Sequence, residues 1–145
     1  MATELSFQST NEIKQYQNTA FAQLLEYLQH NSPFYKELFN KHHIEIKNIK
    51  TIDDLVQIPA TDKNDFSTRN FDFLCVERNK IIDYATTSGT MGRPVTIAVT
   101  ESDLQRLAVN EAQSFACAAG GSTDIYQLML TIDRQFMAGL AIYRE

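Results

Sequence analysis

Residues 84–94 read YATTSGTMGRP and lie between two segments with the character of β-strands. The preceding segment, 81–85, is largely apolar. The following segment, 95–99, alternates with a period of two and is rich in β-branched residues. Together the two segments predict a β-hairpin, and its connecting loop carries hydroxyl groups, two glycines and one arginine.

This loop has the composition expected of an anion-binding loop. Glycine lets the backbone approach a ligand closely, and successive backbone amides can form a concave nest for an anion. Hydroxyl groups and a guanidinium group add donors that match phosphate oxygens. The alternative is an ordinary polar hairpin loop, because Ser, Thr and Gly are common turn residues. The residues that would contact phosphate are Thr87, Ser88, Gly89, Thr90, Gly92 and Arg93.

Two better-known phosphate motifs do not match this stretch. The Walker A motif needs G-x-x-x-x-G-K-(S/T), whereas Gly89 and Gly92 stand closer together and no lysine follows them. The dinucleotide fingerprint G-x-G-x-x-G does not match either. The stretch instead resembles the phosphate loop of the adenylate-forming superfamily, roughly (Y/F)-x-(S/T)-(S/T)-(S/G)-G-(S/T)-(S/T)-G-x-P. Met91 stands where that loop usually has a hydroxyl residue.

Within that superfamily the chain is most similar to phenylacetate–CoA ligases. Two further segments carry the resemblance, SPFY at residues 32–35 and TIDDLVQIPATDKNDF at residues 51–66. The resemblance implies that the loop holds the phosphates of ATP while a substrate carboxylate attacks the α-phosphorus. Coenzyme A then captures the resulting acyl-adenylate. The implied cofactors are ATP, Mg²⁺ and coenzyme A, and the implied substrate is a small carboxylic acid.

The N-terminal half is predicted to be helical. Ser9 and Glu12 have the spacing of a capping box, so a helix is expected from there to about Gln29. Ser32 is expected to cap a second helix with Pro33 at its first position. Two short helices are predicted over residues 51–57 and 61–68.

The C-terminal part is predicted to continue as a β-α-β unit. A helix over residues 101–119 would connect strand 95–99 to a parallel strand at 125–130, and Gly120-Gly121 would end that helix with a left-handed cap. Beyond this unit, the resemblance places Phe136 and Gly139 at the start of an acyl pocket. The alternative is that Phe136 begins a core helix.

The predicted fold class is therefore α/β and helix-rich, with N-terminal helices followed by a β-hairpin that carries the phosphate loop and by a β-α-β unit. We expect residues 1–145 to form one partial domain of a larger ligase domain. Residues 1–70 would be its helical N-terminal segment, and residues 71–145 would begin the α/β nucleotide-binding subdomain.

The resemblance covers only the first part of a family member. The lid lysine and the Mg²⁺-binding glutamate of the family have no counterpart in the chain, so no catalytic residue is assigned and the chain alone is expected to be inactive. An exposed sheet edge or apolar face is expected to make it self-associate into a homo-oligomer. Two alternatives stay open: a ligase that transfers the acyl group to a protein or carrier protein, and a non-catalytic remnant that acts as an association module.

Composition excludes several other classes of protein. A net charge of −5 disfavours nucleic acid as the main partner, because backbone-binding proteins need an excess of Lys and Arg. Two cysteines are too few for a disulfide framework, and no apolar run approaches the length that spans a membrane. A cytoplasmic location is expected. The adjacent pair His42 and His43 does not predict a metal site, since successive helical residues do not share a face.

Overall fold

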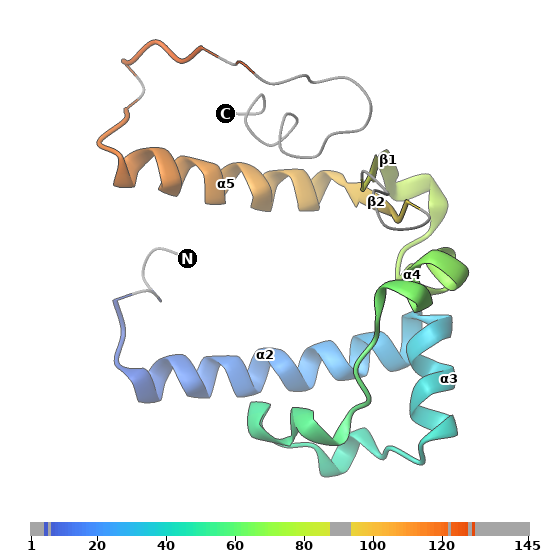
Figure 1. Cartoon of the computed structure of the whole chain (residues 1–145). Helices are drawn as coiled ribbons and strands as arrows, with labels where there is room; N and C mark the ends of the chain where they lie inside the picture. Colours follow the sequence, from blue (N-terminus) through green and yellow to red (C-terminus); the bar gives the residue numbers. More distant parts are fainter. Residues whose placement is uncertain (1–4, 6, 88–93, 122, 128, 130–145) are drawn as a thin grey trace. The chain divides into compact units, whose positions relative to one another are not determined.

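The computed structural model describes residues 5, 7–87, 94–121, 123–127 and 129. The chain divides into two compact units, Met1–Cys75 and Val76–Glu145 (Figure 1). The elements of the first unit are α2 (Thr10–Asn31), α3 (Pro33–Lys41), the 3₁₀-helices η1 (Ile46–Asn48) and η2 (Ile52–Gln57), α4 (Lys63–Arg69) and the 3₁₀-helix η3 (Asn70–Phe73). Those of the second unit are the 3₁₀-helix η4 (Arg78–Lys80), β1 (Ile81–Thr86), β2 (Thr96–Thr100) and α5 (Glu101–Cys117).

The predicted capping box begins α2. The backbone N–H of Ser9 donates to the Glu12 carboxylate at 2.9 Å, and the Glu12 N–H donates back to Ser9 Oγ at 3.4 Å. These bonds satisfy N–H groups that have no partner within the helix. The Ser9 bonds also hold the pKa of the Glu12 carboxyl below its ordinary value.

Ser32 forms the corner between α2 and α3, as predicted. Its side chain accepts the Tyr35 N–H as the N-cap of α3, and Pro33 occupies the first turn of that helix. The Ser32 hydroxyl also donates to the backbone carbonyl of Asp72 at 3.0 Å, which ties the corner to η3. In Figure 1 α3 runs across the end of α2. Ser32 is 1% exposed, so its side chain makes these hydrogen bonds out of contact with solvent.

Two clusters hold the first unit together. One is aliphatic and aromatic, with Leu25, Phe39 and Ile49 buried at its centre. The other is a stack in which the Phe73 ring lies between Phe34, at a centroid distance of 4.0 Å, and Phe66, at 4.2 Å. Apolar side chains from α2, α3, α4 and η3 thus form the core of this unit.

The second unit contains the predicted hairpin. Strands β1 and β2 are antiparallel, with Ala85 opposite Ile97, Thr86 opposite Thr96, and an irregularity between Ile81 and Asp83. Ala85 and Val99 are buried together with Leu104 from the first turn of α5, so α5 packs against one face of the hairpin. The helix-rich α/β class, with N-terminal helices followed by a hairpin, is confirmed.

The predicted strand at 125–130 is wrong at the positions that the structure describes. Residues 125–127 and 129 are not in a strand, and the side chain of Ile125 is 99% exposed. Tyr126 instead turns back toward the end of α5. Its ring lies 4.9 Å from that of Phe115, and its hydroxyl donates to the Gly121 carbonyl at 3.1 Å. An apolar run forms a strand only where a neighbouring strand can accept its backbone hydrogen bonds, and the described sheet has just β1 and β2.

The left-handed residue that ends α5 is Ala119, with a φ of 63°, and not a glycine as predicted. The Gly120 N–H donates to the Phe115 carbonyl at 2.8 Å, which is the long bond of a Schellman motif. A Cβ at Gly120 would lie 2.6 Å from the Tyr126 hydroxyl and 3.0 Å from the Phe115 carbonyl oxygen, so the half-exposed Tyr126 side chain would have to shift. Within the described residues, no helix is long and apolar enough to cross a membrane.

The same motif ends α3, with His43 as its left-handed residue. Its φ is 53°, and the following Ile44 N–H donates to the Phe39 carbonyl at 2.8 Å. Ile44 thereby packs against the cluster around Phe39. The two adjacent histidines thus form the C-terminal end of α3, with His42 as the C-cap and His43 as the left-handed residue.

We expect His43→Gly to stabilise the chain by about 0.5–1 kcal/mol, because glycine adopts a positive φ without the steric cost that a side chain pays. His42→Gly is the matched control. His42 has a φ of −99°, so glycine there adds only flexibility and lowers stability. Urea unfolding of both variants measures the difference, and equal effects would contradict the assignment of His43.

Candidate functional site

The described base of the 84–94 loop is closed by two hydrogen bonds beyond the last register pair of the hairpin. The Thr87 N–H donates to the Val95 carbonyl at 3.0 Å, and the Val95 N–H donates to Thr87 Oγ1 at 3.0 Å. The backbone carbonyl and the backbone N–H of Val95 are therefore both hydrogen-bonded to Thr87. Of the predicted phosphate-contacting residues, only Thr87 can be placed, because residues 88–93 lie outside the described residues.

Burial alternates at this base and fixes which side chains face solvent. Val95 is buried, whereas Thr87 and Pro94 are exposed. The Thr87 hydroxyl accepts one N–H bond, which leaves its own proton able to donate to a ligand. The residues that form the base, 86–87 and 94–96, include no acidic side chain that would repel an anion. Thr87 therefore combines a structural bond with a donor suited to phosphate.

The N-terminus of α5 is not part of this site. Strand β2 runs from the loop toward α5, so the first turn of the helix lies at the opposite end of the hairpin from Thr87 and Val95. That turn is already capped, since Thr100 Oγ1 accepts the Asp103 N–H at 3.3 Å and the Asp103 carboxylate accepts the Thr100 N–H at 2.9 Å. The positive end of the α5 dipole therefore already interacts with the chain's own carboxylates, those of Glu101 and Asp103.

The other predicted site cannot be placed. Phe136 and Gly139, the expected start of an acyl pocket, lie outside the described residues. Within the part of the chain that the structure describes, no group of three or more His, Cys, Asp or Glu side chains could hold a metal ion.

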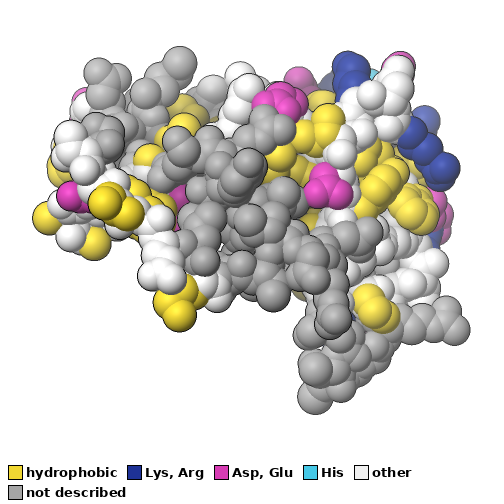
Figure 2. All heavy atoms as spheres, turned by 90° about the horizontal axis from the view of Figure 1, so that it is seen from above, with side chains coloured by type: hydrophobic (Ala, Val, Ile, Leu, Met, Phe, Trp, Pro, Cys, Tyr) yellow, Lys and Arg dark blue, Asp and Glu magenta, His cyan; other side chains and the backbone are white. Residues whose placement is uncertain are grey.

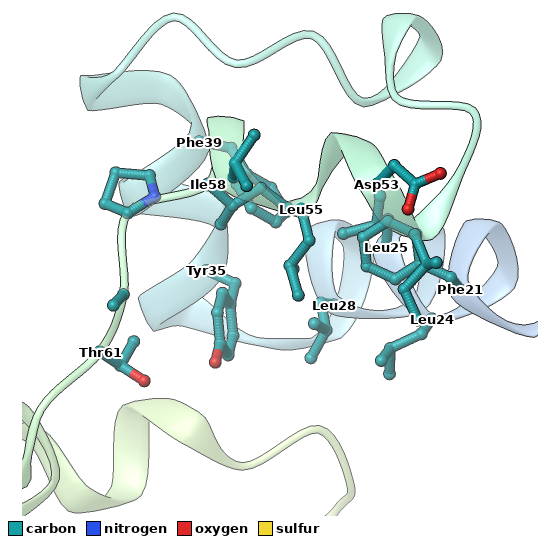
Figure 3. Close-up of a pocket in the computed structure, with 14 residues that line it drawn as sticks. Phe21, Leu24, Leu25, Leu28, Tyr35, Phe39, Asp53, Leu55, Ile58 and Thr61 are labelled. Carbon is teal, nitrogen blue, oxygen red and sulfur yellow. The ribbon is translucent and has the colours of Figure 1, made fainter. Parts of the chain in front are cut away.

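The structure also contains an apolar groove in the first unit, which sequence reasoning did not identify (Figure 3). Its volume is about 760 Å³. Side chains of α2 and α3 form its floor, and η2 together with residues 58–61 forms its wall. The apolar positions of α2 that line it include Leu24 and Leu28, which are four residues apart and therefore share one face of the helix.

Part of this groove is open to solvent. Hydrophobic side chains, yellow in Figure 2, reach the surface at several places in the described part of the chain. Leu24 from α2 and Leu55 from η2 both line the groove, and each is 49% exposed. An amphipathic pattern cannot distinguish such a groove from a closed core, because both need apolar residues on the same helix face.

Hydrogen bonds to Asp54 hold the wall of the groove. Its carboxylate accepts the backbone N–H groups of Thr51, at 2.9 Å, and Lys50, at 3.0 Å. The bond from the Thr51 amide, followed by that from Lys50, lowers the pKa of Asp54 from its ordinary value. In addition, the Ile52 N–H donates to Asn18 Oδ1 of α2 at 2.9 Å, which fastens the wall to the floor.

Comparison with known proteins gives one consistent group of relatives, although no protein-family model matches the chain. The phenylacetate–coenzyme A ligase of Thermus thermophilus is 28% identical over 116 residues, which is 79% of this chain and 26% of that protein. The phenylacetate–coenzyme A ligase of Escherichia coli K12 is 26% identical over 117 residues, 80% of this chain and 27% of that protein. The chain thus spans about a quarter of the length of these relatives.

A solved structure supports the same fold. The structure of 2-hydroxyisobutyryl-CoA ligase in complex with 2-HIB-AMP and CoA matches 72% of this chain and 23% of its own, with a TM-score of 0.65 and 23% identity. These comparisons confirm the resemblance to phenylacetate–CoA ligases that the sequence motifs indicated. The chain resembles the N-terminal part of the phenylacetate–CoA ligases, within the adenylate-forming superfamily.

Proposed function

We propose that the chain is the N-terminal part of an ATP-dependent, AMP-forming acyl- or aryl-CoA ligase, and that the 87–95 loop contacts the phosphates of ATP. The observation that carries the proposal is the closure of the loop base by Thr87 and Val95. It holds together the two ends of a segment rich in glycine and hydroxyl groups. The similarity to phenylacetate–CoA ligases supports it independently.

The proposed reaction has two steps. An oxygen of the substrate carboxylate forms a bond to the α-phosphorus of ATP, and the bond to pyrophosphate breaks, which gives an acyl-adenylate. The thiol of coenzyme A then attacks the acyl carbon, and AMP leaves. Within this chain the contribution is to position the phosphates and to offset their charge. Thr87 would donate a hydroxyl hydrogen bond, Arg93 would add a positive charge, and the amides around Gly89 and Gly92 would donate to phosphate oxygens. Mg²⁺ would accompany ATP.

The hydrogen bond from the Val95 N–H to Thr87 Oγ1 can be tested by substitution at Thr87. Thr87→Val keeps the branched side chain and removes the oxygen that accepts the Val95 N–H. Losing this bond costs about 1 kcal/mol, so we expect the Val95 amide to exchange with solvent about fivefold faster. Thr87→Ser is the matched control and keeps the protected amide. Hydrogen exchange followed by NMR measures both variants, and an unchanged Val95 amide in Thr87→Val would show that the bond does not hold the loop.

Nucleotide binding is tested on the 145-residue chain. We expect Mg·ATP to bind with a Kd on the order of 1 mM, because a phosphate loop alone makes few contacts. In an NMR titration with Mg·ATP, the amide resonances of Thr87 and Val95 should change position. Arg93→Ala should weaken binding by about tenfold through the loss of a charged hydrogen-bond donor. Arg106→Ala is the control, since it removes the same charge from the exposed side of α5. Equal losses in the two variants would mean that only net charge matters.

Catalysis is tested with the longest form of the protein, by acid-dependent ATP–pyrophosphate exchange over a panel of aryl, hydroxy and fatty acids. We expect exchange, and its loss in Gly89→Trp, because an indole ring fills the space where the backbone must approach phosphate. Consumption of coenzyme A then separates a CoA ligase from a ligase that acylates a protein. No exchange with any acid would overturn the proposed adenylation and favour a non-catalytic association module.

A further inference from the structure

We propose that the apolar groove of the first unit binds a neutral, largely apolar small molecule that carries one hydrogen-bonding group. This inference goes beyond the proposed function, because none of the residues 84–94 lines the groove. The volume of about 760 Å³ lies within the range of about 300–1,000 Å³ that is typical of small-molecule sites.

The lining determines the charge of the ligand. Among the side chains that line the groove, only Asp53 is charged, and its carboxylate is bound to Lys14 Nζ at 2.8 Å. The lining therefore offers an anion no partner of opposite charge, and an anionic ligand would lose hydration without compensation. A cation would have to compete with Lys14 for the same carboxylate. A neutral ligand avoids both the loss of hydration and the competition with Lys14.

The lining also provides a place for one polar group. Tyr35 and Thr61 both line the groove and carry hydroxyl groups. Within the described residues, neither hydroxyl group has a hydrogen-bond partner in the structure. Figure 3 shows the Tyr35 hydroxyl directed toward the side of the groove where Thr61 lies. A hydroxyl or amine on the ligand could bond to either residue, whereas the rest of the ligand would contact carbon atoms.

The floor of the groove is preformed, which reduces the cost of ordering it on binding. Leu25 and Phe39 are buried core residues, 3% and 2% exposed, and they also line the groove. The wall is held by the Asp54 bonds and by the bond from Ile52 to Asn18. The rim is different, because Leu24 and Leu55 expose apolar surface that a ligand would bury.

The experiment uses two fluorescent probes that differ by one sulfonate group. N-phenyl-1-naphthylamine is neutral, and 1-anilinonaphthalene-8-sulfonate is its anionic counterpart. We expect the neutral probe to bind the 145-residue chain saturably at one site, and the anionic probe to bind about tenfold more weakly because of its desolvation cost. Ala60→Trp places an indole in the groove from an exposed lining position, and it should weaken binding of the neutral probe by about tenfold. Ala22→Trp, at an exposed position of α2 outside the lining, is the matched control and should leave binding unchanged.

The polar contact is tested by displacement of the neutral probe with 1-octanol. The double variant Tyr35→Phe, Thr61→Val keeps the shape of the lining and removes both hydroxyls, so octanol should compete about fivefold less well. Three results would overturn the proposal: equal binding of the two probes, no difference between Ala60→Trp and Ala22→Trp, or a signal that follows self-association in sedimentation velocity. The last result would assign the groove to a second copy of the chain.

Discussion

A single buried residue, Ser32, connects three elements of the first unit through its hydroxyl group and its backbone N–H. It accepts the Tyr35 N–H at the start of α3 and donates to the Asp72 carbonyl in η3, while the Ser32 backbone N–H donates to Leu28 at the end of α2. A group that is 1% exposed cannot turn to water if one of these partners moves. The direction of α3, and with it the placement of Phe34 and Phe39, depends on this corner.

Aromatic packing extends from that corner. Phe34 follows Pro33 directly and stacks on Phe73, which lies next to Asp72 in the chain. Arg69 covers the cluster, since its guanidinium lies 5.1 Å from the Phe34 ring centroid and pairs with Glu37 and Asp72 at 2.8 Å each. The bonds to Glu37 and Asp72 raise the pKa of Arg69. The SPFY segment that carries part of the family resemblance is therefore, in this structure, a packing motif.

The two candidate sites use opposite physical means. The hairpin loop has its polar Thr87 exposed above buried Ala85 and Val95, so a small apolar base carries a polar tip. The groove has a mostly apolar lining, in which only Tyr35, Asp53 and Thr61 carry polar side-chain groups. A phosphate ligand suits the former because it requires several donors, and a neutral, largely apolar molecule suits the latter because it requires only one polar contact.

The sequence by itself determined the local structure and the family resemblance. The capping boxes at Ser9 and Thr100, the Ser32-Pro33 corner and the alternation of residues 95–99 each depend on neighbours along the chain, so their signals are complete in the sequence. The 84–94 loop and the resemblance to the adenylate-forming superfamily were also readable, because the order of glycines and hydroxyl residues is itself the motif. The role of Thr87 in closing the loop base was not, since its partner Val95 is eight residues away.

Only the tertiary structure decided the features that depend on distant partners. Whether residues 125–129 form a strand is a question of whether a neighbouring strand is present. Whether Leu24 is core or rim depends on where η2 lies, and this is set by the bond from Ile52 to Asn18, 34 residues apart. Gly120 was predicted to end α5 in a left-handed conformation, yet Ala119 adopts it, and the space at Gly120 is limited by the Phe115 carbonyl and the Tyr126 hydroxyl. Local hydrogen bonds are encoded in adjacent residues, whereas burial and cavities depend on contacts that form only when the chain folds.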